Sequence, residues 1–449
     1  MPFIPATEQN RKDMLKAIGV SDFEELLENV PESVQFKGDL DLPSPLSELE
    51  VTNLLHELAG QNAHAGTHVC FLGAGAYDHF IPAAVDHLIS RSEFYTAYTP
   101  YQPEVAQGNL QAIYEYQSMI AELTAMDVAN ASMYDGGSAL AESALLAHGQ
   151  TRRPDILISR TVHPFYRAVV KTYCNRSGIQ VKEVDVKRGI TDTEQLKAMT
   201  GDQTAGVLIQ NPNFFGALEP VESIGKVTHE TGALFSVSVD PVSLGILKPP
   251  GEYGADIVTG EGQVLGNPLN FGGPYVGLFA VKRALVRRLP GRLVGVTRDT
   301  KGRRGFVLTL QTREQHIRRD KATSSICTNE QLCALASAIY LALMGKQGLP
   351  RVAELCIQKS HYLAEEIQKI DGFSLMFDQA FFKEFTVRCP LPPETIIQAM
   401  FKEKIFAGIN LKRFDYDIED GLLIAVTEKR TKVEMDRFVE ALKRLVKDR

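Results

Sequence analysis

The chain has 449 residues, of which 44% are hydrophobic and 23% are charged, and its formal net charge is −7. This ordinary globular composition allows a sizeable core, and its mild acidity argues against a nucleic-acid-binding protein, which normally presents a basic face. No apolar run approaches the ~18 residues of a membrane span, and the first residues lack the basic and apolar regions of a secretory signal.

Cysteine usage indicates a reducing compartment. The cysteines are scattered along the chain, and no two of them form a C-x-x-C pair. Since a chain of this length does not need disulfide bonds for stability, we expect reduced thiols in a cytoplasmic protein. The spacing of zinc ligands is absent too, so we expect no metal site. The six cysteines are Cys70, Cys174, Cys327, Cys333, Cys356 and Cys389.

The first part of the chain is predicted to be an arm. Residues 1–45 are polar and contain weak helical patterns, and we expect them to wrap around another body, such as a partner. Immediately afterwards, Ser47 and Glu50 have the spacing of a capping box that opens a helix. We therefore assign the arm and its helices to residues 1–64.

From about residue 65, short apolar runs alternate with helical segments. The runs at 155–159 and 234–239 are β-branched and almost continuously apolar, which is typical of buried parallel strands. Alternation of strands and helices predicts an α/β fold with a large parallel-sheet domain over residues 65–327. The pattern then becomes more helical with short strands, so we predict a smaller C-terminal α/β domain over residues 328–449.

Three features of the large domain have the chemistry of a ligand site. The sequence DGGSALAES at 135–143 places Gly137 and Ser138 at a helix N-terminus, a geometry that binds phosphate, although a simple turn with Ser138 as N-cap fits equally. His163 lies in the loop after one predicted strand, where α/β folds bind ligands, or is an ordinary surface residue. Asp240 ends another strand, as a helix cap or as a partner of a cationic ring nitrogen.

These features occur in the order typical of enzymes that use pyridoxal phosphate. Such enzymes need a helix N-terminus for phosphate, an aromatic ring stacked on the pyridine, an Asp on its nitrogen and a Lys that bonds the cofactor. In the aspartate-aminotransferase-like family the Lys follows the Asp by one strand. Here that region ends in Gln263, while Lys248 comes too early and Lys282 too late. Without this amine the site is vestigial, or another chain supplies the chemistry.

Long contiguous stretches of the chain are similar to the P-protein of the glycine cleavage system. Together they run through most of residues 64–330, so the resemblance does not depend on one short motif. It implies an aspartate-aminotransferase-like fold, which is pyridoxal-phosphate fold type I. The stretches are 95–142, 247–257, 271–282, 289–299 and 308–328.

The resemblance also implies a reaction and partners. That family's enzyme has two homologous halves, fused in some organisms and split into two subunits in others. The half with the cofactor Lys carries Asn-x-His-Lys where this chain has Gly260-Glu261-Gly262-Gln263, so this chain resembles the N-terminal half, subunit 1. It is then a decarboxylating glycine dehydrogenase only together with subunit 2. Glycine is decarboxylated on pyridoxal phosphate held by subunit 2, and the aminomethyl group passes to the lipoyl arm of the H-protein.

The resemblance further implies a degenerate cofactor pocket and a heterotetramer, because two pairs of homologous subunits associate readily. We expect no cofactor bonded covalently to this chain, and no nucleic-acid or membrane partner. The residues of the degenerate pocket are Gly137, Ser138, His163, Asp240 and Gln263.

Two further segments suit an assembled enzyme. The loop at 95–104 is stiff and rich in tyrosine, and it either lines a pocket shared with the partner or is a packed interface loop without chemistry. Its candidates for the shared site are Tyr98, Tyr101, Gln102 and Glu104. The cationic run at 312–325 is either a solvated helical face or a rim that steers an acidic carrier protein. The rim residues are Arg298, Arg313, Arg318, Arg319 and Lys321, with Arg292 as a further member.

Two alternatives stay open at this stage. The chain could be a self-sufficient pyridoxal-phosphate enzyme that uses an atypical lysine such as Lys248. It could also be a non-enzymatic scaffold or regulator that kept the fold after gene duplication.

Overall fold

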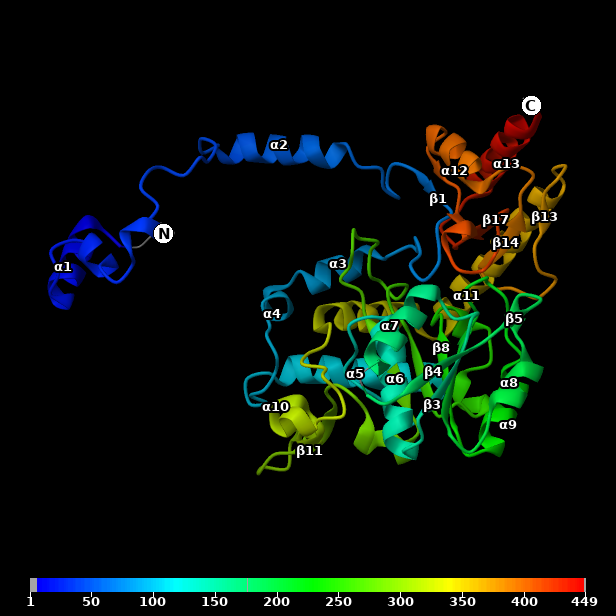
Figure 1. Cartoon of the computed structure of the whole chain (residues 1–449), viewed down its shortest axis with the longest axis horizontal. Coiled ribbons are helices and arrows are strands. Elements are labelled where there is room, and N and C mark those ends of the chain that lie inside the picture. Colours follow the sequence, from blue (N-terminus) through cyan, green and yellow to red (C-terminus); the bar gives the residue numbers. More distant parts are fainter. Residues whose placement is uncertain (1–5, 176, 448–449) are drawn as a thin grey trace. The chain divides into compact units, whose positions relative to one another are not determined.

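The computed structural model describes residues 6–175 and 177–447 (Figure 1). The first five residues of the predicted arm and the last two residues of the chain lie outside the described residues. Contacts divide the chain into two compact units, residues 1–63 and residues 64–449. We call them the N-terminal unit and the main unit.

The described residues of the N-terminal unit form two α-helices and two short 3₁₀ turns. Helix α1 begins after the N-cap Thr7, and it ends at Gly19, whose φ of 92° is readily adopted only by glycine. Helix α2 begins after Ser47, and the predicted capping box of Ser47 and Glu50 is confirmed, since each side chain accepts a bond from the other's backbone N–H. The bounds are α1 (Glu8–Ile18), η1 (Glu24–Leu27), η2 (Glu32–Val34) and α2 (Glu48–Gly60).

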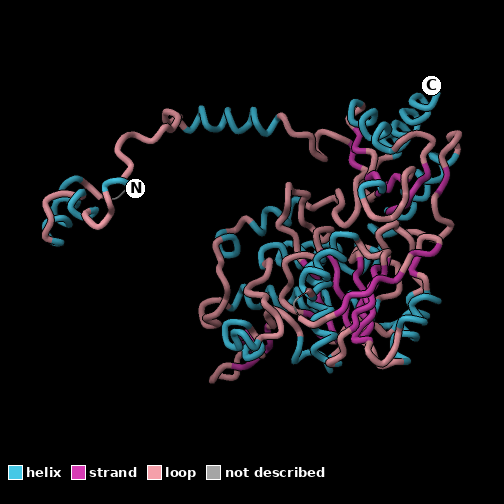
Figure 2. Tube along the Cα trace, viewed as in Figure 1, coloured by secondary structure: helices cyan, strands magenta, loops and turns pink. Residues whose placement is uncertain are grey.

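The main unit is built on a seven-stranded sheet (Figure 2). All neighbouring strands pair in parallel except at β10, which is antiparallel to both of its neighbours. The predicted α/β fold with a large sheet is therefore confirmed, although the sheet is mixed and not wholly parallel as predicted. The spatial order is β2 (Val128–Ala129), β10 (Gly277–Val281), β9 (Ile257–Glu261), β8 (Leu234–Val239), β7 (Thr204–Asn211), β3 (Asp155–Ser159) and β4 (Gln180–Val184).

Helices cover both faces of this sheet, because its central strands are apolar on both sides. Along β7, Val207 and Ile209 belong to one buried cluster, whereas Leu208 between them belongs to another. The helices on the Leu208 side are α6 (Gly136–Thr151) and α7 (Pro164–Cys174), and those on the opposite side include α5 (Gln107–Thr124), α9 (Val221–Glu230) and α11 (Gln331–Gln368).

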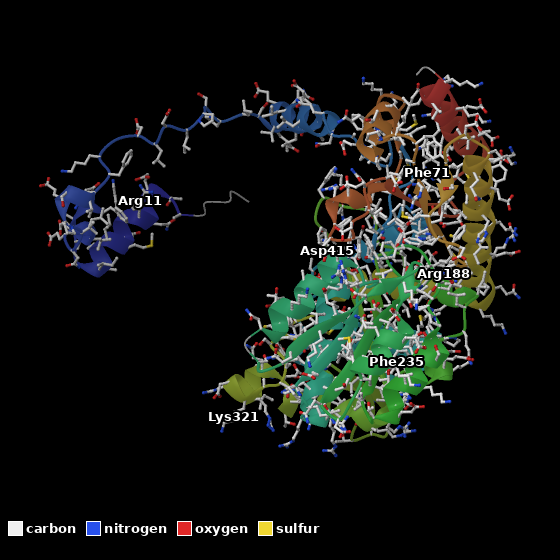
Figure 3. All side chains as sticks on the ribbon, turned by 45° about the vertical axis from the view of Figure 1, so that its right-hand side comes forward. Arg11, Phe71, Arg188, Phe235, Lys321 and Asp415 are labelled. Atoms are coloured by element: carbon white, nitrogen blue, oxygen red, sulfur yellow. The ribbon has the colours of Figure 1, made fainter. Side chains whose placement is uncertain are left out.

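A second, four-stranded antiparallel sheet lies in the C-terminal part of the main unit. Its core contains Phe71, whereas Phe235 lies in the core of the larger sheet (Figure 3). The N-terminal strand β1 pairs with β15, so residues from both ends of the main unit build this part. The elements are β1 (Val69–Cys70), β13 (Ser374–Leu375), β14 (Glu384–Arg388), α12 (Pro393–Lys402), β15 (Ile405–Phe406), β16 (Ile409–Asn410), β17 (Gly421–Ala425) and α13 (Lys432–Lys447). The three-way division at residues 64 and 327 stays a prediction.

Helix α11 is, among the described residues, the one helix that is long and apolar enough to cross a membrane by length and composition alone. Its backbone is not helical at Gly345, where φ is 58° and ψ is −172°, so two helices meet there at a kink. Buried Ala334, Ala336 and Tyr340 pack it into the main core cluster. An apolar helix in a protein core meets the same criteria of length and composition as a membrane-spanning helix.

Shorter elements connect these layers. The hairpin of β11 and β12 precedes the cationic run predicted to be a rim. The remaining elements are α3 (Ala83–Ile89), α4 (Ser92–Tyr95), β5 (Val186–Lys187), β6 (Ile190–Thr191), α8 (Thr193–Met199), η3 (Ser243–Gly245), η4 (Pro250–Tyr253), η5 (Arg283–Arg288), β11 (Val294–Arg298), β12 (Arg304–Leu308), η6 (Gln311–Arg313), α10 (Gln315–Arg318), η7 (Arg319–Lys321) and η8 (Leu411–Arg413).

Candidate functional site

The residues of the predicted degenerate pocket lie at the carboxyl ends of the parallel strands. Asp240 directly follows β8, and His163 follows β3 as the residue that caps α7. Gln263 lies just after β9, and Ser138 lies in the first turn of α6. This edge is where open α/β sheets bind their ligands, and the topology brings these residues to it.

Asp240 already has a cationic partner from within the chain. The Nζ of Lys383 lies 2.6 Å from Asp240 Oδ2, and the Lys383 side chain is only 2% exposed. The same ammonium lies 3.6 Å from the centroid of the Tyr77 ring, a cation–π contact. Lys383 thus occupies the place of the ring nitrogen that Asp240 was expected to bind. Sequence reasoning missed it because Lys383 precedes β14, far along the chain from Asp240.

The ring of His163 likewise has its partners within the same chain. Its ring stacks on Tyr166, with centroids 4.8 Å apart and planes inclined by 27°. Its Nε2 lies 3.0 Å from the carbonyl oxygen of Ala74, and its Nδ1 accepts from the Phe165 N–H. Burial lowers the pKa of His163 to about 4, so the ring is neutral and Nε2–H is the donor to Ala74. The imidazole face that would cover a pyridine ring covers Tyr166 instead.

The N-terminus of α6 is also satisfied internally. Asp135, and not Ser138, is the N-cap, and Ser138 completes the capping box from the third helical position. The Gly136 N–H donates to Glu261 Oε2 at 2.9 Å, while Oε1 accepts from the N–H groups of Gln263 and Val276. Burial raises the pKa of Glu261 to about 8, against the effect of these three donors. The Glu261 carboxyl group therefore occupies the helix end that would hold phosphate.

Glycine at the start of α6 lets a second side chain close this helix end. A Cβ on Gly136 would lie 2.7 Å from the Tyr166 hydroxyl, and one on Gly137 would lie 3.2 Å from a Tyr166 ring carbon. The absence of a side chain therefore accommodates Tyr166, not a ligand. This gives Gly137 a packing role in place of the predicted phosphate contact.

Gln263, which the resemblance placed at the position of the cofactor lysine, has an amide that is fixed in place. Its Oε1 accepts from the Tyr77 N–H at 2.8 Å, and its Nε2 donates to the carbonyl oxygens of Tyr77 and Asn267. The side chain is 2% exposed. A neutral, hydrogen-bonded amide cannot form the covalent bond that a lysine amine would form.

Pyridoxal phosphate does not fit the residues of this pocket. Three of the four roles expected of the site are filled by other side chains of the same chain, the fourth lacks its lysine, and the remaining cavity measures about 30 Å³. That volume holds on the order of two water molecules. The two lysines weighed from the sequence lie elsewhere, since Lys248 pairs with Glu222 and Lys282 pairs with Asp256.

Behind Lys383 lies a buried polar network. His79 Nε2 is 2.9 Å from Lys383 Nζ, and His79 Nδ1 is 2.6 Å from Glu428. The donor atoms of His79, Cys356 and Glu428 lie within 4.8 Å of one another, a spacing that could hold a metal ion. Both ring nitrogens of His79 already have partners, however, and the ammonium of Lys383 opposes a second cation there. We therefore assign these groups to the network and not to a metal centre.

The predicted shared-site loop and the predicted basic rim lie close to each other. Tyr101 stands with its ring 5.4 Å from the guanidinium carbon of Arg292 and 6.0 Å from the ring of His316. Arg292 also donates to the Tyr101 hydroxyl at 3.2 Å, and it is itself 3% exposed. Tyr98 is 87% exposed, and Gln102 and Glu104 are exposed as well.

Two of the rim residues line an open pocket of about 490 Å³. Arg313 and Arg318 line it together with Arg287 and Arg288, which sequence reasoning did not include. No acidic side chain of the described residues lines the pocket. Lys321 lies near the outer edge of the main unit (Figure 3), and Arg298 is exposed at the end of β11. The arrangement therefore offers positive charge to a solvent-exposed surface.

Comparisons with known proteins agree closely over the whole chain. The family model described as "Glycine cleavage system P-protein" matches residues 1–442. The "Probable glycine dehydrogenase (decarboxylating) subunit 1" of Chloroherpeton thalassium is 55% identical over 99% of this chain and 100% of its own length. The protein with the same description from Carboxydothermus hydrogenoformans is 54% identical over 98% of this chain and 99% of its own length.

Solved structures give the same result for the fold. A crystal structure of glycine decarboxylase (P-protein) of the glycine cleavage system, in inhibitor-bound form, has a TM-score of 0.91 and 44% identity. The match covers 99% of this chain and 100% of the chain in that crystal structure. Glutamate decarboxylase of Lactobacillus brevis, at 13% identity and a TM-score of 0.70 over 93% of this chain and 96% of that one, shares the fold alone.

Proposed function

The chain belongs to the glycine cleavage system P-protein family, and we propose that it is the subunit of a two-chain glycine decarboxylase that does not itself bond the cofactor. The resemblance drawn from the sequence is thereby confirmed. In the complete enzyme, glycine is decarboxylated on pyridoxal phosphate, which supplies an electron sink for the bond that breaks. The aminomethyl group then passes to the lipoyl arm of a carrier, the H-protein.

One observation carries the assignment of roles: the cofactor pocket of this chain is filled by its own side chains. Lys383 pairs with Asp240, and Glu261 accepts from the N-terminus of α6. No lysine follows Asp240 at the end of the next strand, where Gln263 is found. We infer that the partner subunit binds pyridoxal phosphate and that this chain completes the enzyme from outside that pocket.

What this chain contributes to the shared active site is proposed to come from the loop at 95–104. Arg292 is buried and anchored to Cys327, Thr328 and Asn329, and from there it supports Tyr101. This support holds a hydroxyl and an aromatic face at the surface with little freedom. Tyr98, Gln102 and Glu104 are exposed on the same loop, so they are available to a partner.

The basic rim is proposed to guide the carrier protein. Charges of one sign around an open pocket steer a partner of opposite charge, and the effect weakens with salt. Burial lowers the pKa of Arg313, and two of its guanidinium nitrogens have no partner among the described residues. These two atoms are buried, so the exposed cations of the rim, Arg318, Arg319 and Lys321, are the ones available to the carrier.

The assembly is proposed to be a cytoplasmic heterotetramer. The six free cysteines fit a reducing compartment. Two homologous subunits pair naturally about a pseudo-twofold axis, and two such pairs close into a symmetric particle.

The direct test is reconstitution from separately purified chains. This chain and a lysine-bearing sister chain are mixed, and exchange of labelled bicarbonate into the carboxyl group of glycine is measured with the carrier present. We expect exchange from the pair and none from either chain alone. Exchange by this chain alone would show a self-sufficient enzyme, and a sister chain that is fully active without it would leave this chain a scaffold or regulator.

A further inference from the structure

The described part of the N-terminal unit, residues 6–63, has no core of its own. Among residues 6–63 no side chain is buried, although the segment is far from purely polar. Of the 29 large apolar side chains that are exposed among the described residues, 16 belong to it. Such an accumulation of apolar surface on a short segment marks an interaction surface.

Helix α2 shows how this surface is organised. Val51, Leu54, Leu55 and Leu58 follow the i, i+3, i+4, i+7 spacing that puts them on one face, and they are 40–57% exposed. Asn53 and His56 lie on the opposite face. A helix of 13 residues is marginal in water even with a capping box, because helices in proteins are stabilised mainly by burying an apolar face. Helix α2 therefore needs a surface on which to pack.

The net charge of the N-terminal unit indicates which kind of surface α2 packs on. Residues 6–63 contain 12 acidic and 4 basic side chains, a net charge of −8, whereas the whole chain carries −7. The segment thus holds the entire negative excess of the protein. A complementary surface combines an apolar groove with basic residues along its edges.

We propose that α2, with its Val51/Leu54/Leu55/Leu58 stripe, docks into an apolar, basic-edged groove of the lysine-bearing partner subunit and is a principal anchor of the two-chain enzyme. The proposal rests on the proposed function, which requires a stable partner. A standard interface takes about 20–30 residues from each side, and this segment offers more than that without any internal burial to disrupt. The family match begins at residue 1, so the segment is part of the shared family chain and not an appendage.

The test compares two full-length variants of equal charge. Leu54→Asp/Leu55→Asp disrupts the stripe, and Asn53→Asp/His56→Asp adds the same negative charge to the opposite face of the same helix. Affinity for the purified partner subunit is measured by analytical ultracentrifugation. The stripe variant is expected to bind about 100-fold more weakly, as for central interface residues, and the control within about threefold of wild type. Both are expected to keep the thermal transition of the main unit, since none of the four positions is buried.

Hydrogen exchange adds a second readout. In the free wild-type chain the amides of residues 48–60 should exchange fast, and they should become protected when the partner is added. Equal affinity of wild type and the stripe variant, or absence of protection, would overturn the proposal while leaving the exchange activity of the pair intact. A homodimer of this chain that the stripe variant dissociates would assign the surface to a second copy and overturn it too. Failure of the wild-type chains to associate at all would remove both this surface and the proposed function.

Discussion

Replacing Lys383 by methionine should destabilise the main unit strongly. The substitution keeps the length of the side chain but removes the ammonium that lies 2.6 Å from Asp240. The Asp240 side chain is only 12% exposed, so its carboxylate would stay buried without its cation. Removal of one member of a buried ion pair costs about 3–5 kcal/mol, and loss of the contact with the Tyr77 ring adds to this.

Calorimetry and urea denaturation measure the effect, and a double-mutant cycle identifies its cause. We expect Lys383→Met to lower the free energy of unfolding by about 3–5 kcal/mol. The double variant Lys383→Met/Asp240→Leu should recover most of this loss, because two apolar groups leave no unpaired charge. Lys248→Met, which breaks the exposed pair with Glu222, is the matched control and should stay within about 1 kcal/mol of wild type. A loss below about 1 kcal/mol for Lys383→Met, or a double variant as unstable as the sum of its parts, would refute the internal ion pair as the group that fills the pocket.

Three further predictions concern the loop, the rim and the network behind Lys383. In the assembled enzyme, Tyr101→Phe should reduce turnover or raise the Michaelis constant for glycine by about tenfold through loss of a positioned hydroxyl, and unchanged kinetics would remove Tyr101 from the shared site. Reversing the charges of Arg318, Arg319 and Lys321 to Glu should raise the Michaelis constant for the carrier and flatten its salt dependence, whereas transfer that ignores both salt and these substitutions argues for a merely solvated face. Burial tends to raise the pKa of Glu428, but the imidazole and the N–H groups around it prevail and lower the pKa to about 2. Its stabilisation is therefore present above its unfolded pKa of about 4.5 and lost as pH falls toward 2, so Glu428→Gln should flatten the acid limb of a stability–pH curve, and an unchanged slope would contradict this assignment.

Local sequence patterns predicted most of the features that depend on residues close together in the sequence. The apolar runs became β3 and β8, and the capping box at Ser47 formed, because strand burial and helix capping depend on residues a few positions apart. Asp240 and His163 were placed at the correct edge of the sheet, because the ends of parallel strands meet there.

What the sequence did not reveal depends on tertiary proximity. Lys383 directly precedes β14 of the second sheet and reaches the pocket from there. Nothing in the sequence around Lys383 indicates that its partner is Asp240. Glu261 is close to Gln263 in the sequence, but its bond to the N-terminus of α6 forms only because α6 packs next to β9. The antiparallel direction of β10 was equally hidden, because an apolar run of five residues reads the same in either direction.

The location of the cofactor is the central claim, and covalent trapping tests it most directly. The assembled two-chain enzyme is loaded with pyridoxal phosphate, reduced with borohydride, digested and mapped by mass spectrometry. The filled pocket predicts a pyridoxyl-lysine in a peptide of the partner subunit and none in this chain. A pyridoxyl adduct on Lys383, or on any other lysine of this chain, would contradict it.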